Sequence, residues 1–488
     1  MIQKSSAQRF RMSPPRRGDG GRPVRVSVEP NLKGAAEQSK DGVSLGTVLT
    51  GVGLLASSAL LSACTGGVAT PHNPACVETL SDTSETQGEV DLAKGECVVG
   101  DFLVDTQGRK LTPGSSEGGI GADVNENGDY IAATNYGIMV GNVNEGNTAR
   151  FLTDANGRKL TPGSSEGGIG AAINNKGQFV AATNYGTVVG DINKGTVGEF
   201  LTDSGGRKLT PGSSEGGIGA DINNHGQFIV STNYGTMIGD VDEGTTATFL
   251  TDAGGRKLTP GSSEGGIGAA INEHGQFVAA TNYGTLTGDV DDGPVAEFLT
   301  DAGGRKLTPG SSQGGIGADI NEHGQFVVGT NYGSLVGDLD EGAMATFVTD
   351  EGGRKLTPGS SEGGIGAGIN ERGQFVVGTN YGTVTGNVNQ GSAGRFLTDA
   401  EGRKLTPGSS GAGIGADINE QGEYVVATNY GTMVGDLDEG TVATFVTDAG
   451  GHKLTPGSSD GGIGAGINED GQFVASTNYG TLTGQVPR

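Results

Sequence analysis

The sharpest chemical pattern in the sequence is a run of oxygen-bearing side chains at alternate positions. Asp123, Asn125 and Asn127 precede Gly128, as in the first half of a calcium-binding loop. The glutamate expected at the twelfth position of such a loop is absent, and a later copy of the segment has Ala172 in place of the first ligand. Two interpretations are open: a calcium site at these three residues, or an Asn-Gly hairpin turn, which the missing ligands favour.

A second pattern with binding chemistry is the tetrapeptide Thr-Asn-Tyr-Gly, which recurs throughout the chain. Aromatic rings beside amide donors suit a carbohydrate or peptide ligand. The alternative, which we favour, is a turn in which Asn and Gly adopt unusual backbone angles while Tyr packs between repeats. The ligand-surface hypothesis applies to Asn135, Tyr136, Asn184, Tyr185, Asn233, Tyr234, Asn282 and Tyr283.

The sequence offers no catalytic constellation. A catalytic site needs a distinct set of base, nucleophile and stabilising group. Three of the five histidines share one repeated turn position, one replaces a repeated arginine, and one lies outside the repeats: His225, His274, His323, His452 and His72, respectively. We therefore predict that the protein is not an enzyme and needs no cofactor.

The cysteines indicate export. Residues 1–41 are polar and basic, and the uncharged stretch 42–63 ends at Leu61-Ser62-Ala63-Cys64. These four residues resemble the lipobox of bacterial lipoproteins, which implies that residues 1–63 are a signal peptide and that Cys64 carries the lipid. An uncleaved membrane helix is the alternative for the uncharged stretch, since about 20 residues suffice to span a membrane. We expect an exported protein anchored to a bacterial membrane.

The segment that follows, residues 64–90, is rich in Gly, Pro, Ser and Thr and is predicted to be a flexible tether. Cys76 and Cys97 are then the remaining thiols. An even pair in an oxidising compartment favours a disulfide over a metal site.

Nearly all of residues 91–488 consists of one 49-residue unit, whose copies start at Phe102, Phe151, Phe200, Phe249, Phe298, Phe347, Phe396 and Phe445. In the unit that begins at Phe200, strands are predicted at 200–203, 207–210, 218–223, 227–232 and, as a possible fifth, 236–241. No window has ten residues of helical period, so the fold class is all-β. Units of this length with four or five short strands match propeller blades, and we predict an eight-bladed β-propeller, with a β-solenoid as the alternative.

Two details of the array support a closed ring with an even number of blades. The last copy stops short of the segment that would lead into the next Phe, while residues 88–91 and 97–100 loosely resemble that missing segment. The residue before the turn alternates between acidic and small, which indicates growth by duplication of 98-residue pairs: Asp123, Ala172, Asp221, Ala270, Asp319, Gly368, Asp417 and Gly466.

The unit resembles a known family. The string Ile320-Asn-Glu-His-Gly-Gln-Phe-Val-Val-Gly329, with Phe298-Leu-Thr-Asp301, resembles the HAF-type extracellular repeats of bacteria across residues 102–488. The resemblance implies propeller-like blades outside the cell. This chain departs from the family in having Thr where the family often has Trp, and in adding a Tyr-Gly-Thr segment.

The net charge limits the classes of partner that we expect. The net charge is −25, and residues 1–44 carry nine basic against four acidic residues, which leaves −30 for the remainder. Such a body repels phosphate backbones, so nucleic acid is not an expected partner. We predict a monomeric, lipid-anchored binding or adhesion scaffold whose protein or carbohydrate ligand the sequence does not identify; an amyloid-like structural assembly is the alternative.

Overall fold

The computed structural model describes residues 98–487 with short internal gaps. The gaps are 112–120, 135–136, 161–168, 184–185, 196, 210–217, 233–234, 259–266, 282–283, 308–315, 331–332, 357–364, 380–381, 406–413, 429–430, 455–462 and 478–479. The chain divides into two units, Met1–His72 and Asn73–Arg488, and all described residues belong to the second.

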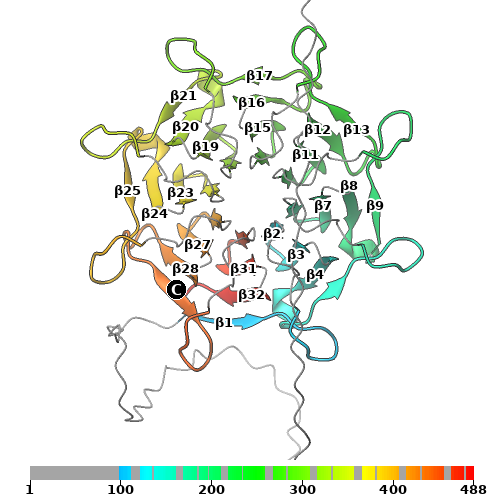
Figure 1. Ribbon diagram of the computed structural model, residues 1–488, viewed down its shortest axis with the longest axis horizontal. Helices are drawn as coiled ribbons and strands as arrows, with labels where there is room; N and C mark the ends of the chain where they lie inside the picture. Colours follow the sequence, from blue (N-terminus) through cyan, green and yellow to red (C-terminus); the bar gives the residue numbers. More distant parts are fainter. Residues whose placement is uncertain are drawn as a thin grey trace, which may run out of the picture. The chain divides into compact units, whose positions relative to one another are not determined.

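The second unit is a ring of four-stranded antiparallel sheets, shown in Figure 1. Six sheets stand alone, and the eight-stranded sheet consists of two further blades joined where β1 pairs with β29 in parallel. The eight-bladed β-propeller is therefore confirmed. The solenoid alternative is wrong, because the last blade returns to the first.

Seven blades place their strands in chain order from the axis outward, and the eighth, β30–β32, takes its outer strand from the start of the described chain, as β1. The innermost strands are β2 (Gly121–Val124), β6 (Gly170–Ile173), β10 (Gly219–Ile222), β14 (Gly268–Ile271), β18 (Gly317–Ile320), β22 (Gly366–Ile369), β26 (Gly415–Ile418) and β30 (Gly464–Ile467). The second strands are β3 (Asp129–Thr134), β7 (Gln178–Thr183), β11 (Gln227–Thr232), β15 (Gln276–Thr281), β19 (Gln325–Thr330), β23 (Gln374–Thr379), β27 (Glu423–Thr428) and β31 (Gln472–Thr477).

The third strands are β4 (Gly137–Asn142), β8 (Gly186–Asp191), β12 (Gly235–Asp240), β16 (Gly284–Asp289), β20 (Gly333–Asp338), β24 (Gly382–Asn387), β28 (Gly431–Asp436) and β32 (Gly480–Gln485). The outer strands are β5 (Arg150–Phe151), β9 (Gly198–Phe200), β13 (Ala247–Phe249), β17 (Glu297–Phe298), β21 (Ala345–Phe347), β25 (Gly394–Phe396), β29 (Thr444–Thr447) and β1 (Val98–Phe102). Short 3-10 turns follow some third strands: η1 (Val143–Glu145), η2 (Ile192–Lys194), η3 (Leu339–Glu341) and η4 (Val388–Gln390).

Strands from both ends of the described chain close the ring. β1 pairs antiparallel with β32 through Gly100↔Gly484, Asp101↔Thr483 and Phe102↔Leu482. It also pairs in parallel with β29, where the Thr447 hydroxyl donates to the Val98 carbonyl at 3.3 Å. The first strand of the described residues therefore completes the last blade, as the short final copy predicts.

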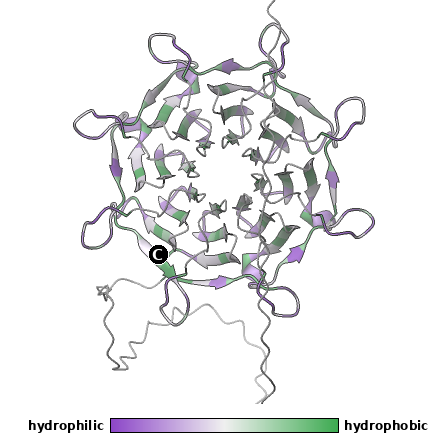
Figure 2. Ribbon diagram, viewed as in Figure 1, coloured by the Kyte–Doolittle hydropathy of each residue, from purple (hydrophilic) through white to green (hydrophobic). Residues whose placement is uncertain are grey.

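The hydrophobic core lies between consecutive blades. One buried cluster joins Ala270 and Val278 of one blade to Ile316, Phe326 and Val328 of the next. Figure 2 shows apolar residues along the strands and hydrophilic residues on the rim loops. Because both faces of each sheet are covered by neighbouring sheets, the second strands are apolar on both sides, as the sequence predicts. The aromatic residue of the second strand is fully buried in every blade: Tyr130, Phe179, Phe228, Phe277, Phe326, Phe375, Tyr424 and Phe473.

Glycine makes two close approaches possible. A Cβ on Gly288 of β16 would lie 2.7 Å from Cζ of Phe277, so the third strand leaves space for the buried ring. A Cβ on Gly268 of β14 would lie 2.7 Å from the Ala318 nitrogen of the next blade. Innermost strands can converge on the axis only with glycine at this position.

The rim differs from the sequence prediction. The outer strand begins before the unit's leading Phe and ends on it, so β9 is Gly198–Phe200. The strand predicted at 207–210 is only an isolated bridge between Thr202 and Lys208. The leading Phe is only partly buried: Phe200 packs against a buried interblade cluster, and Lys208 Nζ lies 3.6 Å from the centroid of its ring. Desolvation lowers the pKa of Lys208 from its usual range.

Candidate functional site

The functional candidate is one face of the ring, formed by one set of turns that occurs in all eight blades and a second set that occurs in the seven blades from β2–β5 to β26–β29. The first set joins the innermost to the second strand, and the second set joins the third to the outer strand. We call this surface the turn face. Each hairpin of the first set is shaped by an asparagine: Asn321 Oδ1 accepts hydrogen bonds from the backbone N–H groups of His323 and Gln325. Gly324, with φ of 75°, completes the turn.

The same asparagines tie the blades into a closed circle. Asn321 Nδ2 donates to the Asn370 carbonyl of the next blade at 2.9 Å, and Asn370 does the same to Asn419. Asn468 of the last blade donates to the Asn125 carbonyl of the first at 3.0 Å. An amide side chain both accepts and donates, so one residue type can shape its own turn and hold the next blade. The members of this Asn ring are Asn125, Asn174, Asn223, Asn272, Asn321, Asn370, Asn419 and Asn468.

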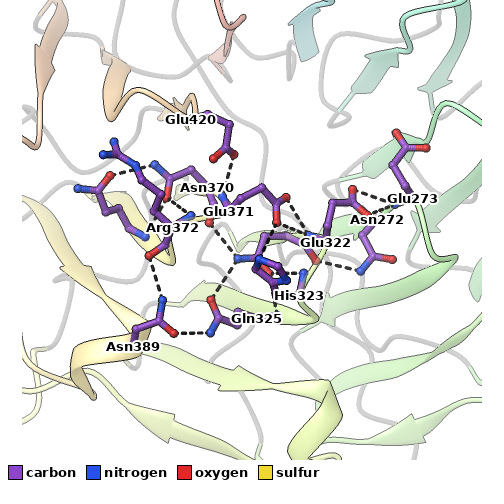
Figure 3. Close-up of polar contacts among 12 residues, drawn as sticks. Asn272, Glu273, Glu322, His323, Gln325, Asn370, Glu371, Arg372, Asn389 and Glu420 are labelled. Carbon is purple, nitrogen blue, oxygen red and sulfur yellow. Dashed lines mark hydrogen bonds and ion pairs between the residues drawn. The ribbon is translucent and has the colours of Figure 1, made fainter.

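A second circle lies at the next residue of each turn, and we call it the Glu ring. The Glu322 backbone N–H donates to the Glu371 carboxylate at 2.8 Å, and the Glu371 N–H donates to Glu420 at 2.7 Å (Figure 3). The circle closes where the Glu469 N–H donates to Glu126 Oε2 at 3.0 Å. Its members are Glu126, Asn175, Asn224, Glu273, Glu322, Glu371, Glu420 and Glu469.

Electrostatics within the Glu ring oppose full ionisation. Burial raises the pKa of Glu322 and Glu371 above the usual glutamate value, and repulsion from the preceding carboxylate of the ring, Glu273 for Glu322 and Glu322 for Glu371, adds to it. The backbone N–H groups that they accept act in the opposite direction. His323 Nε2 lies 3.9 Å from Glu371 Oε2.

Long polar side chains of the second strands connect the two sets of turns. Gln374 Nε2 donates to Asp438 Oδ1 of the next blade at 2.8 Å, and Arg372 Nη1 lies 2.6 Å from Asp438 Oδ2. Gln325 Nε2 donates to Asn389 Oδ1 at 2.7 Å. The turn face is therefore cross-linked between blades both at the Asn ring and farther from the axis.

Axial aspartates lie beneath the Asn ring. Asp319 Oδ1 accepts the N–H of Ile320 in its own blade at 2.9 Å, and Oδ2 accepts the N–H of Ile369 in the next blade at 2.8 Å. Asp123, Asp221 and Asp417 repeat this arrangement. Four carboxylates thus supply eight oxygens, one to each innermost strand. The acidic and small residues alternate because one aspartate serves two blades.

The axial carboxylates carry raised pKa values. Burial raises the pKa of Asp221 and of Asp417 to about 7, and neighbouring aspartates add to the shift. Burial, then the negative charge of Asp417, raises the pKa of Asp319 well above the usual value. Beside this layer, paired Gly and Ala residues of the eight innermost strands line an axial cavity of about 220 Å³.

The structure places the calcium candidates in these interblade contacts. Asp123 accepts from Val124 and Ile173, and Asn125 Oδ1 accepts from the N–H groups of Asn127 and Asp129. Asn127 Nδ2 donates to the Asn175 carbonyl of the next blade. The Asn-Gly turn is present. No group of three or more His, Cys, Asp or Glu residues suited to a metal occurs within the described ranges, and calcium binding stays a prediction.

The other predicted site residues lie outside the described residues. These are Cys64, Cys76, Cys97 and the Asn-Tyr pairs at 135–136, 184–185, 233–234 and 282–283. Among the residues with described structure, no helix has the length and apolar character needed to cross a membrane. Lipid attachment, the disulfide and the Asn-Tyr ligand surface remain predictions.

Sequence reasoning missed the two hydrogen-bonded circles and the reason for the alternating aspartates. The signal was present, since Asn125 and its counterparts recur at every turn with an oxygen-bearing residue after each. The partners are about 49 residues away, however, so a local motif search assigns these side chains to turns or metal loops.

Comparisons with known proteins return structures only. No protein-family model and no curated protein matches the chain. AztD from Citrobacter koseri shares 12% identity at a TM-score of 0.42, covering 76% of this chain and 90% of that chain. BamB from Moraxella catarrhalis shares 12% identity at a TM-score of 0.42, covering 74% and 92%.

The extracellular domain of the hybrid two-component system BT3049 from B. thetaiotaomicron also matches, at 12% identity and a TM-score of 0.40. The match covers 65% of this chain but only 40% of that one. Likeness at this level transfers no function, and the propeller assignment depends on this chain's own strand order.

Proposed function

We propose that the protein is an exported, lipid-anchored interaction scaffold whose turn face binds a cationic partner. The charge of that face carries the proposal. The turns of the two sets hold sixteen acidic residues against Lys176, Lys194 and Arg372 as the basic ones. A surface on which negative charge predominates steers and concentrates positively charged ligands.

The acidic residues are densest on three consecutive blades. Between Asn223 and Glu341 the two sets of turns contain no Lys or Arg. Six exposed carboxylates project there from the turns after β12, β16 and β20: Asp242, Glu243, Asp291, Asp292, Asp340 and Glu341. We call this the acidic arc. Interblade hydrogen bonds, such as that from Gln227 Nε2 to Asp291 Oδ1 at 2.7 Å, fix part of it in place.

A rigid arc of carboxylates fits a Lys- or Arg-rich peptide segment. Binding such a partner costs the scaffold little conformational entropy, because its turns are already held by backbone hydrogen bonds. Binding between exposed charges weakens with added salt, as screening shortens the range of attraction.

The test uses fluorescence anisotropy with a labelled ten-residue oligolysine and the mature chain. We expect saturable binding that weakens at higher salt, and at least a tenfold loss when all six arc residues are changed to Asn or Gln. The matched control is Glu351→Gln with Glu401→Gln, two acidic residues of the rim loops, which should retain wild-type binding. Equal binding by the arc variant, or none by the wild type, would refute the cationic partner.

The anchor has its own test. The lipobox resemblance at residues 61–64 supports export and lipid attachment at Cys64. We expect Cys64→Ser to move the protein from the membrane fraction to the soluble fraction. Unchanged membrane retention would favour the uncleaved helix.

A further inference from the structure

The axial carboxylates are like charges held together without a counter-ion among their neighbours. β10, which carries Asp221, packs against β6, β7, β11 and β14, and none of these strands has a titratable side chain. The charged groups that act on Asp221 are Asp123 and Glu273, and both are acidic. Among the described residues, the arrangement therefore has no cation that stabilises the ionised form.

Asp319 and Asp417 likewise have no Lys, Arg or His on the strands packed against them. β18, which carries Asp319, packs against β14, β15, β19 and β22, which have no titratable side chain, and Asp319 interacts with Asp221 and Asp417. β26 carries Asp417 and packs against β22, β23, β27 and β30. Only β27 contributes titratable groups, Glu423, which accepts a hydrogen bond from Asn419 Nδ2 at 2.8 Å, and Tyr424, whose pKa is raised by burial.

We propose that Asp221, Asp319 and Asp417 form a proton-sensitive contact between paired blades at the axis. This contact stabilises the ring most when the carboxyl groups are protonated. Each aspartate is the axial tie between two blades, since one oxygen binds its own strand and the other the next. A neutral carboxyl keeps lone pairs on both oxygens for these N–H groups. Loss of the proton to solvent leaves the ties in place but adds negative charges that repel one another around the axis.

The direction of the pH effect follows from linkage. A group whose pKa is higher in the folded than in the unfolded chain stabilises the fold fully below the unfolded value, and the stabilisation is lost as pH rises through the folded value. The usual aspartate pKa is 3.8, and the pKa of Asp221 and Asp417 is raised to about 7. The ring should therefore lose stability between about pH 5 and pH 8. This device is independent of what the turn face binds.

The experiment measures thermal unfolding of the full chain from pH 5 to pH 8 at constant ionic strength. We expect the wild-type Tm to fall by roughly 5 °C or more over this range. The triple variant Asp221→Asn, Asp319→Asn, Asp417→Asn should lose most of this slope. Glu322→Gln with Glu371→Gln, which neutralises part of the Glu ring, is the control and should retain most of it. A triple variant with the wild-type slope would overturn the proposal.

A second measurement uses the wild type alone, in case the triple variant does not fold. Infrared spectra of the folded chain with isotope-labelled aspartate should show a protonated carboxyl band at pH 6 that disappears by pH 9. Fully ionised aspartates at pH 6 would overturn the proposal regardless of any variant.

Discussion

At the scale of single residues, the bifunctional side chain of asparagine organises the turn face. Asn321 is 2% exposed, and it accepts from His323 and Gln325 while donating to the Asn370 carbonyl. A buried group that satisfies several backbone partners is costly to remove, because each orphaned polar group must lose its hydration. This residue therefore stabilises both its own hairpin and the joint between two blades.

We expect Asn321→Ala to lower the free energy of unfolding by about 2–4 kcal/mol, as the loss of a buried hydrogen-bond network does. Chemical denaturation measures the change. Asn321→Asp retains the acceptor for the turn but loses the donor to Asn370, so it should fall between the wild type and the alanine variant. An Asp variant as damaged as the Ala variant would assign all the stability to the interblade bond.

The Glu ring also contributes negative charge to the turn face. Asp and Glu side chains on the turn face accept backbone N–H groups where a neutral acceptor would serve, as Asn175 and Asn224 do in the Glu ring. The ring therefore does not require carboxylates for its hydrogen bonds. The excess of Glu at these positions increases the negative charge of the face that we assign to partner binding.

At the scale of strands, hydroxyl groups between the second and third strands differ from blade to blade. Ser231 on β11 and Thr236 on β12 lie opposite each other, with their hydroxyls 2.8 Å apart, and Ser476 pairs with Thr481 in the same way. In other blades the residue opposite is Ala or Gly, and the buried hydroxyl has no hydrogen-bond partner: Thr187, Thr285, Ser334, Thr383 and Thr432. A buried hydroxyl without a partner is destabilising.

We expect Ala280→Ser to stabilise the protein by about 1 kcal/mol, since it places a hydroxyl opposite Thr285 as Ser231 does opposite Thr236. A rise in Tm measures the effect. The matched control is Ala279→Ser, which faces Leu286 in a buried apolar cluster and should be destabilising. If both substitutions lower Tm alike, the missing partner is not what limits this blade.

At the scale of the whole ring, closure depends on a single strand from the start of the described chain. β1 is the outer strand of the blade whose other strands are β30, β31 and β32. Without it, the edge of β32 exposes unpaired backbone groups, and such edges pair with other molecules. Val98, which is 2% exposed, would also leave the core between the last two blades.

We expect deletion of residues 2–102 to lower Tm and to produce concentration-dependent oligomers, measured by size-exclusion chromatography with light scattering. Deletion of residues 2–90 is the control. It leaves β1 intact and should give a monomeric propeller with the wild-type Tm. Equal behaviour of the two truncations would show that β1 does not hold the ring closed.

Much of this architecture can be predicted from the sequence, because each blade is encoded locally. Pleated strands follow from the apolar pattern of residues such as 227–232, and the turns from Asn and Gly at fixed offsets. The unvarying 49-residue period fixes the number of blades, and the shortened last copy predicts closure by the segment before Phe102. The rim was less predictable, since the leading Phe is apolar in type but only partly buried, at the edge of the core and under a lysine.

The functional candidate required the tertiary structure. The sequence alone gives the aspartate at every second repeat, but its partner is the N–H of a residue 50 positions away, as for Asp319 and Ile369. No local pattern reveals that hydrogen bond, because it exists only where innermost strands converge on the axis. The sequence thus determined the unit, its count and its charge. Only the closed ring decided that one carboxylate serves two blades and that acidic turns from separate repeats form a single face.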